Sequence, residues 1–422
     1  MKRTLLFRGP IKTLSGYGSH SRDVLKSLYD LDLFDIKIDS CNWGNTPMTA
    51  LDPENDLFHQ WIESSIVTTL DEQPEIYVQV TVPNEFQRKG KYNIGITAGI
   101  ETTAAPKSWV DGINRMDKVI TTSTFSRDVL LQTVYNETDK VTGKLIKQHR
   151  ITTPIEILHE GVDLSTYYKT ESDLELNIEE DFAFLFVGHW LKGDIGQDRK
   201  DVGMLIKCFC ESFKEGEDRP ALILKTSGAT FSIKQREYFR KKIQQITQSY
   251  SNPPSIYLLF GQLTDKEMND LYNHPKVKTM VTLTKGEGFG RPLLEFSMSG
   301  KPVIASNWSG HKDFLPMNKS VLLGGKLTEV HESASDDFIM KSSKWFTANY
   351  NEVVEVLKVV KEEYDDFLER SEELREDNMK SFSLEKTTED LKMIFEGLSI
   401  KEEIKPTKTK LVLPELKKVE KE

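Results

Sequence analysis

The chain has 422 residues and a formal net charge of −10 at pH 7. This length allows two or three domains with full hydrophobic cores, and the negative charge argues against the broad basic surface of a nonspecific DNA-binding protein. Three cysteines, Cys41, Cys208 and Cys210, are too few for a disulfide framework. No apolar run approaches the roughly 20 residues of a membrane-spanning helix, and the first residues, MKRTLLFRGP, lack the features of a signal peptide.

Short apolar runs alternate with longer amphipathic stretches, which is typical of parallel sheets with crossover helices. The first series of expected strands is Thr4–Phe7, Ile36–Asp39, Ile76–Val82, Ile94–Ala98, Lys118–Thr122 and Ile155–His159. The second series is Phe182–Gly188, Ala221–Gly228, Ser255–Gly261, Lys278–Thr284 and Pro302–Ser306. A polar, acidic stretch at 168–181 separates the two series. We therefore expect two tandem Rossmann-like, doubly wound α/β domains, residues 1–170 and 171–385, that face each other across a cleft.

The last part of the chain is charged and has a helical pattern. Residues 345–377 predict a solvated helical face over a narrow apolar stripe. We expect a further helix at 386–399 that packs back near the N-terminal domain. Residues 400–422 are rich in lysine and contain two prolines, and we expect them to form a flexible charged tail.

The stretch TKGEGFGRPLLEFSMSGKPVIAS, residues 284–306, predicts a strand, a glycine loop, a helix and a strand. Gly286, Gly288 and Gly290 allow a tight turn and a close approach of the backbone to a ligand. Pro292 suits the first helical turn and Gly300 suits the helix end. The loop thus precedes a helix N-terminus, where backbone N–H groups and the helix dipole favour an anion.

Two glutamates, Glu287 in the loop and Glu295 in the helix, make a dinucleotide an unsuitable ligand. A carboxylate beside a pyrophosphate is unfavourable, and GEGFG lacks the Gly-x-Gly-x-x-Gly spacing. Ionised carboxylates instead accept strong hydrogen bonds from hydroxyl groups. The pattern indicates a nucleotide-sugar, with its phosphates on N–H groups, its ribose on Glu295 and its sugar hydroxyls on Glu287. Two unrelated surface glutamates near a helix start are the alternative.

The stretch EGFGRPLLE resembles the Glu–seven–Glu motif of retaining glycosyltransferases with the GT-B fold, of the glycosyltransferase family 4 type. The resemblance covers roughly residues 5–395. Four further segments match the family's order: SGYGSHSRDVL at 15–25, HEGVDLSTY at 159–167, FLFVGHWLKGDIGQDRKDVGMLIKCF at 184–209 and SGHKDFL at 309–315. Together with NWGNTP and GITAGIETT, the N-terminal segment resembles such enzymes carried by large tailed bacteriophages. The resemblance implies a cytoplasmic enzyme, in the host cytoplasm if a phage encodes it.

The resemblance also implies roles for individual residues. Glu287 would contact the donor sugar and Glu295 the ribose, while Lys200 and Arg199 would neutralise the leaving diphosphate. The further donor-binding residues implied are Gly16, Gly18, His189, Gly288, Phe289, Gly290 and Arg291. The family usually has arginine where this chain has His189, so a neutral, hydrogen-bonded histidine at a strand end is the alternative there.

The N-terminal domain departs from the family at residues 98–101, where many relatives carry a histidine near the donor sugar. Glu101 lies in this stretch and, if it points into the cleft, orients or deprotonates the acceptor hydroxyl. A structural role in capping the TTAAP turn is the alternative. The carboxylates at Asp30 and Asp32 do not follow a nucleotide loop. No metal or other cofactor is therefore expected, and the nucleotide-sugar is a substrate.

The expected reaction is transfer of a hexosyl or pentosyl group from a UDP- or GDP-linked donor to an acceptor hydroxyl. The resemblance implies retention of configuration by front-face displacement. The acceptor is either a hydroxymethylated pyrimidine in phage DNA or a glycan. The basic runs FQRKGK and KLIKQHR could meet the phosphates of DNA, and ordinary solvated charge is the alternative for each run. We expect no integral membrane association. A nucleotide-sugar-binding protein without turnover, and another GT-B enzyme such as an epimerase or a phosphorylase, are the competing functions.

Overall fold

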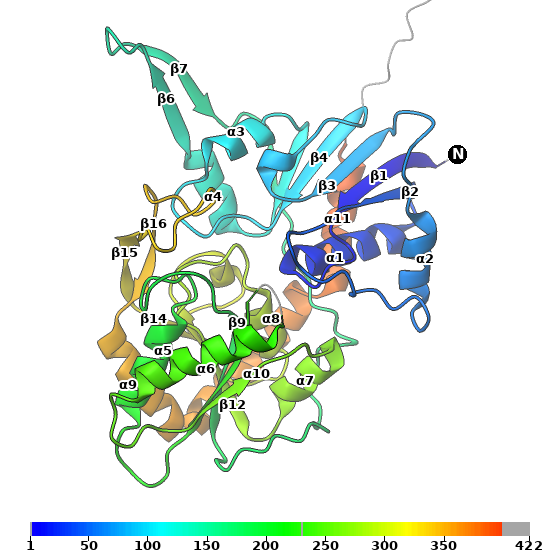
Figure 1. Ribbon diagram of the computed structural model, residues 1–422. Helices are drawn as coiled ribbons and strands as arrows, with labels where there is room; N and C mark the ends of the chain where they lie inside the picture. Colours follow the sequence, from blue (N-terminus) through cyan, green and yellow to red (C-terminus); the bar gives the residue numbers. More distant parts are fainter. Residues whose placement is uncertain (1, 229–230, 399–422) are drawn as a thin grey trace, which may run out of the picture.

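The computed structural model describes residues 2–228 and 231–398, which form two α/β domains (Figure 1). In the described residues, each domain contains a six-stranded sheet whose paired strands are all parallel. The two doubly wound domains predicted from the sequence are thus confirmed. Each of the eleven predicted strands corresponds to an observed strand, with ends that differ by a few residues.

The N-terminal sheet has the strand order β2-β1-β3-β4-β5-β8. Its strands are β1 (Arg3–Gly9), β2 (Phe34–Ser40), β3 (Ile76–Val80), β4 (Tyr92–Thr97), β5 (Lys118–Thr121) and β8 (Ile155–Ile157). Its helices are α1 (Gly16–Leu31), α2 (Leu57–Ser65), α3 (Lys107–Ile113) and α4 (Thr124–Gln132), with a 3-10 turn, η1 (Pro83–Glu85). Leu5 and Phe7 of β1 face one core and Leu6 faces another. Both faces are covered, which explains why these strands are apolar at nearly every position.

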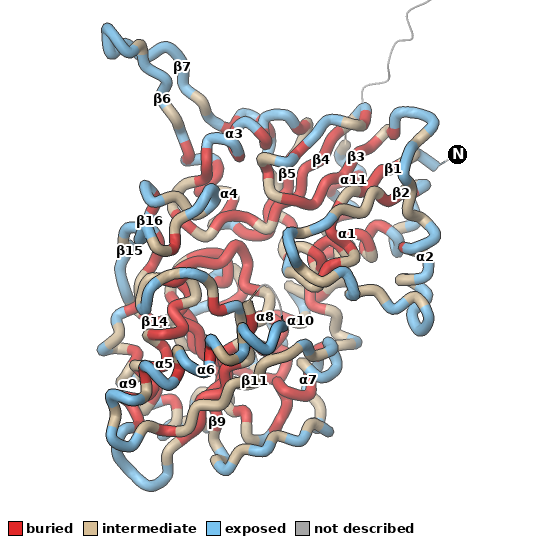
Figure 2. Tube along the Cα trace, viewed as in Figure 1, coloured by how far each residue is buried: buried red, intermediate tan, exposed pale blue. Residues whose placement is uncertain are grey.

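The C-terminal sheet has the order β11-β10-β9-β12-β13-β14. Its strands are β9 (Ala183–His189), β10 (Ala221–Ser227), β11 (Ile256–Leu259), β12 (Val277–Val281), β13 (Val303–Ser306) and β14 (Val321–Leu323). Its helices are α5 (Val202–Ser212), α6 (Ile233–Thr247), α7 (Asp265–Asn273), α8 (Arg291–Ser297), α9 (Tyr350–Glu362) and α10 (Tyr364–Ser381), with a 3-10 turn, η2 (Gly310–Asp313). Figure 2 shows that burial is concentrated in the two sheets and the facing sides of these helices.

Two antiparallel hairpins were not predicted. One consists of β6 (Val134–Thr138) and β7 (Leu145–Arg150), and the other of β15 (Gly325–Glu329) and β16 (Lys344–Ala348). The expectation of a helical pattern from Trp345 onward is wrong for the first five residues of that stretch, because four belong to β16 and Asn349 caps α9. Trp345 is fully buried in a small core beside Val330, and strand pairing with β15 places it there. The helical stretch that follows is divided between α9 and α10 at Glu363.

The helix α11 (Leu384–Glu396) belongs in space to the N-terminal domain, although it follows the C-terminal domain in the chain. Leu391, Ile394 and Phe395 pack into the core formed by α1 and the N-terminal sheet. The crossing from α10 is fixed by backbone hydrogen bonds of Val162 with Phe382 (2.9 Å) and Leu384 (2.8 Å). The chain therefore connects its two domains twice. The predicted tail at 400–422 lies outside the described residues.

None of the helices in the described ranges is both long enough and apolar enough to cross a bilayer.

Replacing Leu391 with alanine should destabilise the N-terminal domain, because the side chain is fully buried between α11 and α1. We expect a loss of about 2–5 kcal/mol in the free energy of unfolding, measured by denaturant titration. Met393→Ala on the same helix is the matched control, since Met393 is 62% exposed. Equal effects of the two substitutions would contradict the assignment of α11 to the N-terminal core.

Candidate active site

The glycine loop predicted from the sequence connects β12 to α8. The strand ends at Val281, three residues earlier than expected, and α8 has seven residues. Gly290 has φ +102° and precedes the first helical residue, so its position requires a residue without a side chain. Pro292 is the second helical residue, where its fixed φ suits the first turn.

Gly286 and Gly288 approach the backbone of the other domain. A Cβ atom on Gly286 would lie 2.0 Å from the carbonyl oxygen of Glu101, and one on Gly288 would lie 1.9 Å from that of Ala98. The carbonyl oxygen of Gly288 also accepts a hydrogen bond from the hydroxyl of Ser123 (2.6 Å). These two glycines therefore make a close contact between the domains, where the sequence predicted a close contact with a ligand.

The carboxylate of Glu287 is buried between two cations. It forms ion pairs with Lys200 and with Arg199, whose Nη1 lies 3.2 Å from Oε2. Burial opposes ionisation of this carboxylate, but the two positive charges outweigh it and lower its pKa to about 2. Glu287 is thus ionised at neutral pH. The fold brings together the three residues to which the sequence assigned the donor sugar and the diphosphate.

The position of Arg199 and Lys200 depends on a second buried ion pair that the sequence analysis missed. Asp201 and Lys285 are both almost completely buried, and their charged groups lie 3.0 Å apart. Asp201 also accepts a hydrogen bond from the hydroxyl of Tyr350 (2.7 Å), and it has a left-handed backbone with φ +54°. The N–H of Lys285 donates to the carbonyl of Arg199 (2.7 Å). These contacts fix the turn that presents the two cations to Glu287.

Glu295 is buried and is hydrogen-bonded to Arg291, whose Nε lies 2.7 Å from its Oε1. Burial raises the pKa of Glu295 to about 7, although the charge of Arg291 opposes this shift. Arg291 also pairs with Asp23 on α1 and lies 3.7 Å from Glu160. Burial likewise raises the pKa of Glu160 to about 7. Arg291 therefore connects the predicted ribose-binding carboxylate to two acidic groups of the N-terminal domain.

The two glycines predicted to face the diphosphate differ in their surroundings. A Cβ atom on Gly18 would lie 2.2 Å from the carbonyl oxygen of Thr13, so this glycine is required by the fold of its own loop. A Cβ atom on Gly16, the first residue of α1, would meet no atom within 4 Å. Only Gly16 has the open space beside it that a bound ligand would need.

Glu101 follows β4 and lies at the domain junction, with Oε1 3.7 Å from Arg199. Burial raises its pKa and Arg199 acts in the opposite direction. Within the described residues, its carboxylate makes no hydrogen bond to the TTAAP turn. Instead, the hydroxyl of Thr102 donates to the carbonyl of Ala104 (3.1 Å). The geometry favours the cleft over the capping role for this residue.

His189 ends β9, and its Nδ1 lies 3.3 Å from the carbonyl oxygen of Ser227 and 3.2 Å from the hydroxyl oxygen of the same residue. Desolvation lowers its pKa, and the nearby charges of Lys200 and Arg199 act in the same direction. A neutral, hydrogen-bonded imidazole at a strand end is the alternative that the sequence left open, and the geometry favours it.

Phe289 has a buried side chain that packs against Phe314, with ring centroids 5.0 Å apart. Its side chain is therefore part of the C-terminal core. Any contact of Phe289 with a donor would have to come from its backbone.

A second contact between the domains lies beside the glycine loop. Asp313 in η2 accepts hydrogen bonds from the N–H of Thr124 (2.8 Å) and from Nε2 of His159 (3.0 Å). The ring of Phe125 meets that of Trp308 edge-on at 4.7 Å. The motifs HEGVD and SGHKDFL are thus joined in space, and the cleft is closed in this structure.

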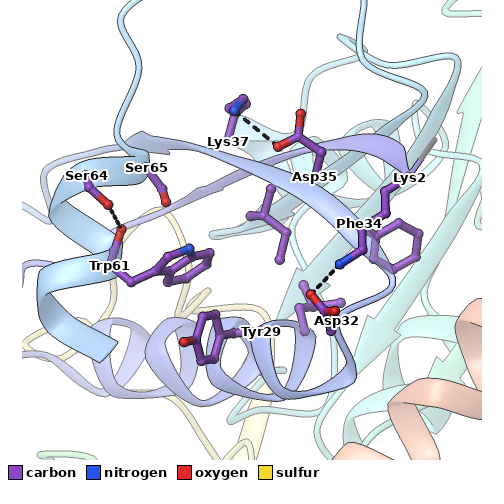
Figure 3. Close-up of a pocket in the computed structure, with 11 residues that line it drawn as sticks. Lys2, Tyr29, Asp32, Phe34, Asp35, Lys37, Trp61, Ser64 and Ser65 are labelled. Atoms are coloured by element: carbon purple, nitrogen blue, oxygen red, sulfur yellow. Dashed lines mark hydrogen bonds and ion pairs between the residues drawn. The ribbon is translucent and has the colours of Figure 1, made fainter. Parts of the chain in front are cut away.

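The pocket drawn in Figure 3 lies apart from the glycine loop. It has a volume of about 360 Å³ and is lined by residues of β2, α1 and α2, including Tyr29 and Trp61, together with Lys2 before β1 and Asp32 after α1. Ion pairs of Lys2 with Asp32 and of Lys37 with Asp35 border it. It contains none of the predicted site residues. Across the described residues, no group of three or more His, Cys, Asp and Glu side chains is placed to hold a metal ion.

Comparison with known proteins finds a family match in the C-terminal half of the chain. A family model described as "Glycosyl transferases group 1" matches residues 177–344, which contain the glycine loop and the Arg199–Lys200 pair. A search of curated proteins finds no match to this sequence.

Three solved structures show the same two-domain architecture. HepE of Anabaena, in complex with UDP and glucose, has a TM-score of 0.59 at 12% identity, covering 94% of this chain and 100% of that chain. Sucrose-phosphate synthase from Thermosynechococcus elongatus has a TM-score of 0.63 and a glycosyltransferase from Rickettsia africae 0.61. Both are 13% identical, and each comparison covers 94% of this chain and 98% of the other. This likeness establishes the GT-B fold.

Gly286→Ala should open the contact between the domains, because the added Cβ would lie 2.0 Å from a backbone oxygen that cannot move aside as a flexible side chain would. We expect a larger radius of gyration in small-angle X-ray scattering. Gly397→Ala is the control, since its added Cβ meets no atom closer than 3.5 Å. Scattering by Gly286→Ala that matches both the wild type and the control would show that the closed contact is not the state in solution.

Proposed function

We propose that this protein is a glycosyltransferase that moves a sugar from a nucleotide-sugar, UDP- or GDP-linked, to an acceptor hydroxyl with retention of configuration. The observation that carries the proposal is the cluster of Glu287, Lys200 and Arg199 at the glycine loop of a GT-B fold. The family match over residues 177–344 supports the same function.

Each group of the cluster suits one part of the reaction. The ionised Glu287 accepts hydrogen bonds from sugar hydroxyls, and Glu295 accepts those of the ribose. Lys200 and Arg199 stabilise the negative charge that develops on the leaving diphosphate. The bond between the anomeric carbon and the phosphate oxygen breaks, and the acceptor oxygen forms the new bond on the same face. The acceptor proton passes to the leaving phosphate, and Glu101 orients the acceptor hydroxyl.

The closed cleft implies that the enzyme opens during turnover. Gly286 and Gly288 lie directly against the N-terminal domain, and Lys200 and Arg199 are already neutralised by Glu287 and Glu101. Binding of a diphosphate therefore requires the domains to separate and the cations to exchange partners. Reclosure then expels water and limits hydrolysis of the donor.

The structure weakens one of the two arguments for a DNA acceptor. In the run FQRKGK, Arg88 pairs with Asp117 (2.9 Å) and Lys89 with Asp39 (3.0 Å). Their charges are satisfied within the domain, and reversing them would disturb the fold as well as any DNA contact. Together with the net charge of −10, this favours a glycan over a hydroxymethylated pyrimidine as the acceptor.

Two competing functions remain distinguishable by their products. A nucleotide-sugar-binding protein would release no nucleotide. Another GT-B enzyme would either convert the donor sugar without any acceptor, as an epimerase, or require inorganic phosphate, as a phosphorylase.

The function can be tested by incubating the protein with a panel of nucleotide-sugars, together with glycan acceptors or hydroxymethylated DNA. Released nucleotide and the mass of the acceptor are measured together by mass spectrometry. We expect one donor to release nucleotide and one acceptor to gain a hexose or pentose mass, with both signals lost in Glu295→Ala. An epimerised donor without transfer, or donor binding with no release for any acceptor, would contradict the proposal.

The raised pKa of Glu295, about 7, predicts a pH dependence of donor binding. Only the carboxylate form accepts both ribose hydrogen bonds, so affinity should rise by up to about tenfold between pH 6 and pH 8. Stability should move in the opposite direction. The folded state favours the protonated form of Glu295, so its protonation adds to the free energy of unfolding. This stabilisation is fully present below the ordinary pKa of 4.5 and is lost as the pH rises through about 7.

Calorimetric titration with the nucleotide-sugar at several pH values measures this dependence. Glu295→Gln should bind weakly with no dependence on pH. Glu160→Gln is the second variant, because Glu160 has a similar pKa near Arg291. If the pH dependence of donor affinity persists in Glu295→Gln but disappears in Glu160→Gln, the titrating group is Glu160 and the prediction for Glu295 is wrong.

A further inference from the structure

The hairpin of β6 and β7, residues 134–150, forms an arm. The arm leaves the N-terminal domain after α4 and projects away from both sheets (Figure 1). Figure 2 shows it exposed along almost its whole length. An isolated two-stranded hairpin is at best marginally stable in water, and its two free edges are a liability for aggregation. An exposed hairpin of this kind contributes little to the protein's own fold, which points to a binding partner outside the protein.

The root of the arm is fixed at the junction of the two domains. The hydroxyl of Tyr135 donates a hydrogen bond to the carbonyl of Ala105 (2.6 Å) and lies 3.4 Å from the sulfur of Met340 in the C-terminal domain. The side-chain amide of Asn114 donates to the carbonyl of Arg150 (2.8 Å). The root of the arm, and with it the direction in which the arm leaves the N-terminal domain, is therefore set by the fold.

Both carboxylates of the arm are satisfied within it. Asp139 accepts hydrogen bonds from the N–H groups of Val141 (3.0 Å) and Thr142 (2.6 Å), which shapes the turn. Glu137 pairs with His149 at 2.9 Å. The cations are not satisfied in the same way. Among the described residues, no carboxylate lies within ion-pairing distance of the charged groups of Lys140, Lys144, Lys147 and Arg150.

The far end of the arm combines two of these cations, Lys140 and Lys144, with exposed apolar side chains. Val141 is 93% exposed, Ile146 61% and Leu145 59%. They lie in the turn and at the start of β7, next to Lys140 and Lys144. Apolar side chains surrounded by lysines, on an element held away from the domain body, suit the boundary between the headgroups and the acyl chains of a membrane.

We propose that the arm docks this protein on the surface of an anionic phospholipid membrane. Val141, Leu145 and Ile146 enter the headgroup region, and the lysines contact the phosphates, each strengthening the attraction to an anionic surface. The charge of the arm opposes the net charge of −10 of the whole chain, so docking orients the protein with the arm towards the membrane.

Two other occupants fit the arm less well. A second copy of this chain would bring the lysines of two arms together, which is unfavourable. A nucleic acid would neutralise the lysines, but it offers no apolar environment to three exposed aliphatic side chains.

The consequence for the acceptor rests on the proposed function. From Tyr135 to Lys140 the arm extends roughly 17 Å, at about 3.4 Å per residue. An acceptor carried by the membrane must bridge this distance to reach the cleft. A glycan chain attached to a lipid is long enough, whereas a bare headgroup is not.

The experiment measures co-flotation of the full chain with vesicles of phosphatidylcholine containing phosphatidylglycerol, and with vesicles of phosphatidylcholine alone. We expect binding to the anionic vesicles that weakens with salt. Val141→Ser/Ile146→Ser and Lys140→Glu/Lys144→Glu should each reduce it at least about tenfold. The matched controls are on α6, where Ile233 is 73% exposed and Lys234 and Lys241 are exposed. Ile233→Ser and Lys234→Glu/Lys241→Glu should bind as the wild type does.

Absence of vesicle binding, equal binding to both kinds of vesicle, or equal loss in the arm variants and the α6 controls would each overturn the proposal. Binding to a DNA duplex that is stronger than binding to anionic vesicles, and lost in the arm variants, would overturn it in favour of a nucleic-acid partner. Nucleotide release from the donor is measured in the same samples. If docking fails while release persists, the inference about the arm is wrong and the proposed function stands. If the protein docks on anionic vesicles but no donor releases nucleotide, the inference about the arm stands and the proposed function is wrong.

Discussion

A buried carboxylate that stays ionised between two cations is the interaction on which the cleft depends. Burying the charged carboxylate of Glu287 alone would cost free energy, and the ion pairs with Lys200 and Arg199 compensate this cost. They can do so because the segment after β9 places both cations beside the glycine loop. The buried ion pair of Asp201 and Lys285 holds this segment in place. Removing one partner would leave an unpaired charge in the interior, so these groups are coupled and their effects on stability will not be additive.

The same loop also joins the domains. Gly286 and Gly288 lie so close to the carbonyls of Glu101 and Ala98 that no other residue fits without a shift of the backbone. Ser123 bonds to the carbonyl of Gly288 from the N-terminal side. The loop that holds the proposed sugar-binding Glu287 is therefore the same loop that closes the domains on each other. A ligand that displaces one partner of Glu287 acts directly on the contact that keeps the cleft closed.

The sequence was sufficient for the parts of the fold that have a strong local signal. Apolar runs buried on both faces predict the parallel strands, and glycines beside Glu287 predict the loop. Contacts between distant segments have no such signal. Asp201 and Lys285 look like ordinary surface charges in the sequence, and the bond of Arg291 to Asp23 joins residues 268 positions apart. The second strand of the arm looks like a basic run in the sequence, because an exposed strand lacks the apolar alternation of a half-buried one.

The glycines show a second limit of sequence reasoning. A glycine in a loop indicates that something lies close to the backbone, but it does not say what. Gly18 is required by the carbonyl of Thr13, and Gly286 by the carbonyl of Glu101. Gly16 is the one of these three whose surroundings are open. Only the three-dimensional arrangement separates a glycine that admits a ligand from one that admits another part of the chain.

If Lys200 and Arg199, held by Glu287, form a diphosphate site, a nucleoside diphosphate should bind there without sugar or acceptor. Calorimetric titration of the wild type, Lys200→Met and Lys326→Met with UDP, GDP and ADP measures this binding. Lys326 is an exposed residue of β15 and serves as the control. We expect one of the nucleotides to bind to the wild type and to Lys326→Met, and to bind at least tenfold more weakly, about 1.4 kcal/mol, to a folded Lys200→Met. Binding of none of the three nucleotides, or equal binding by all three proteins, would contradict the diphosphate site.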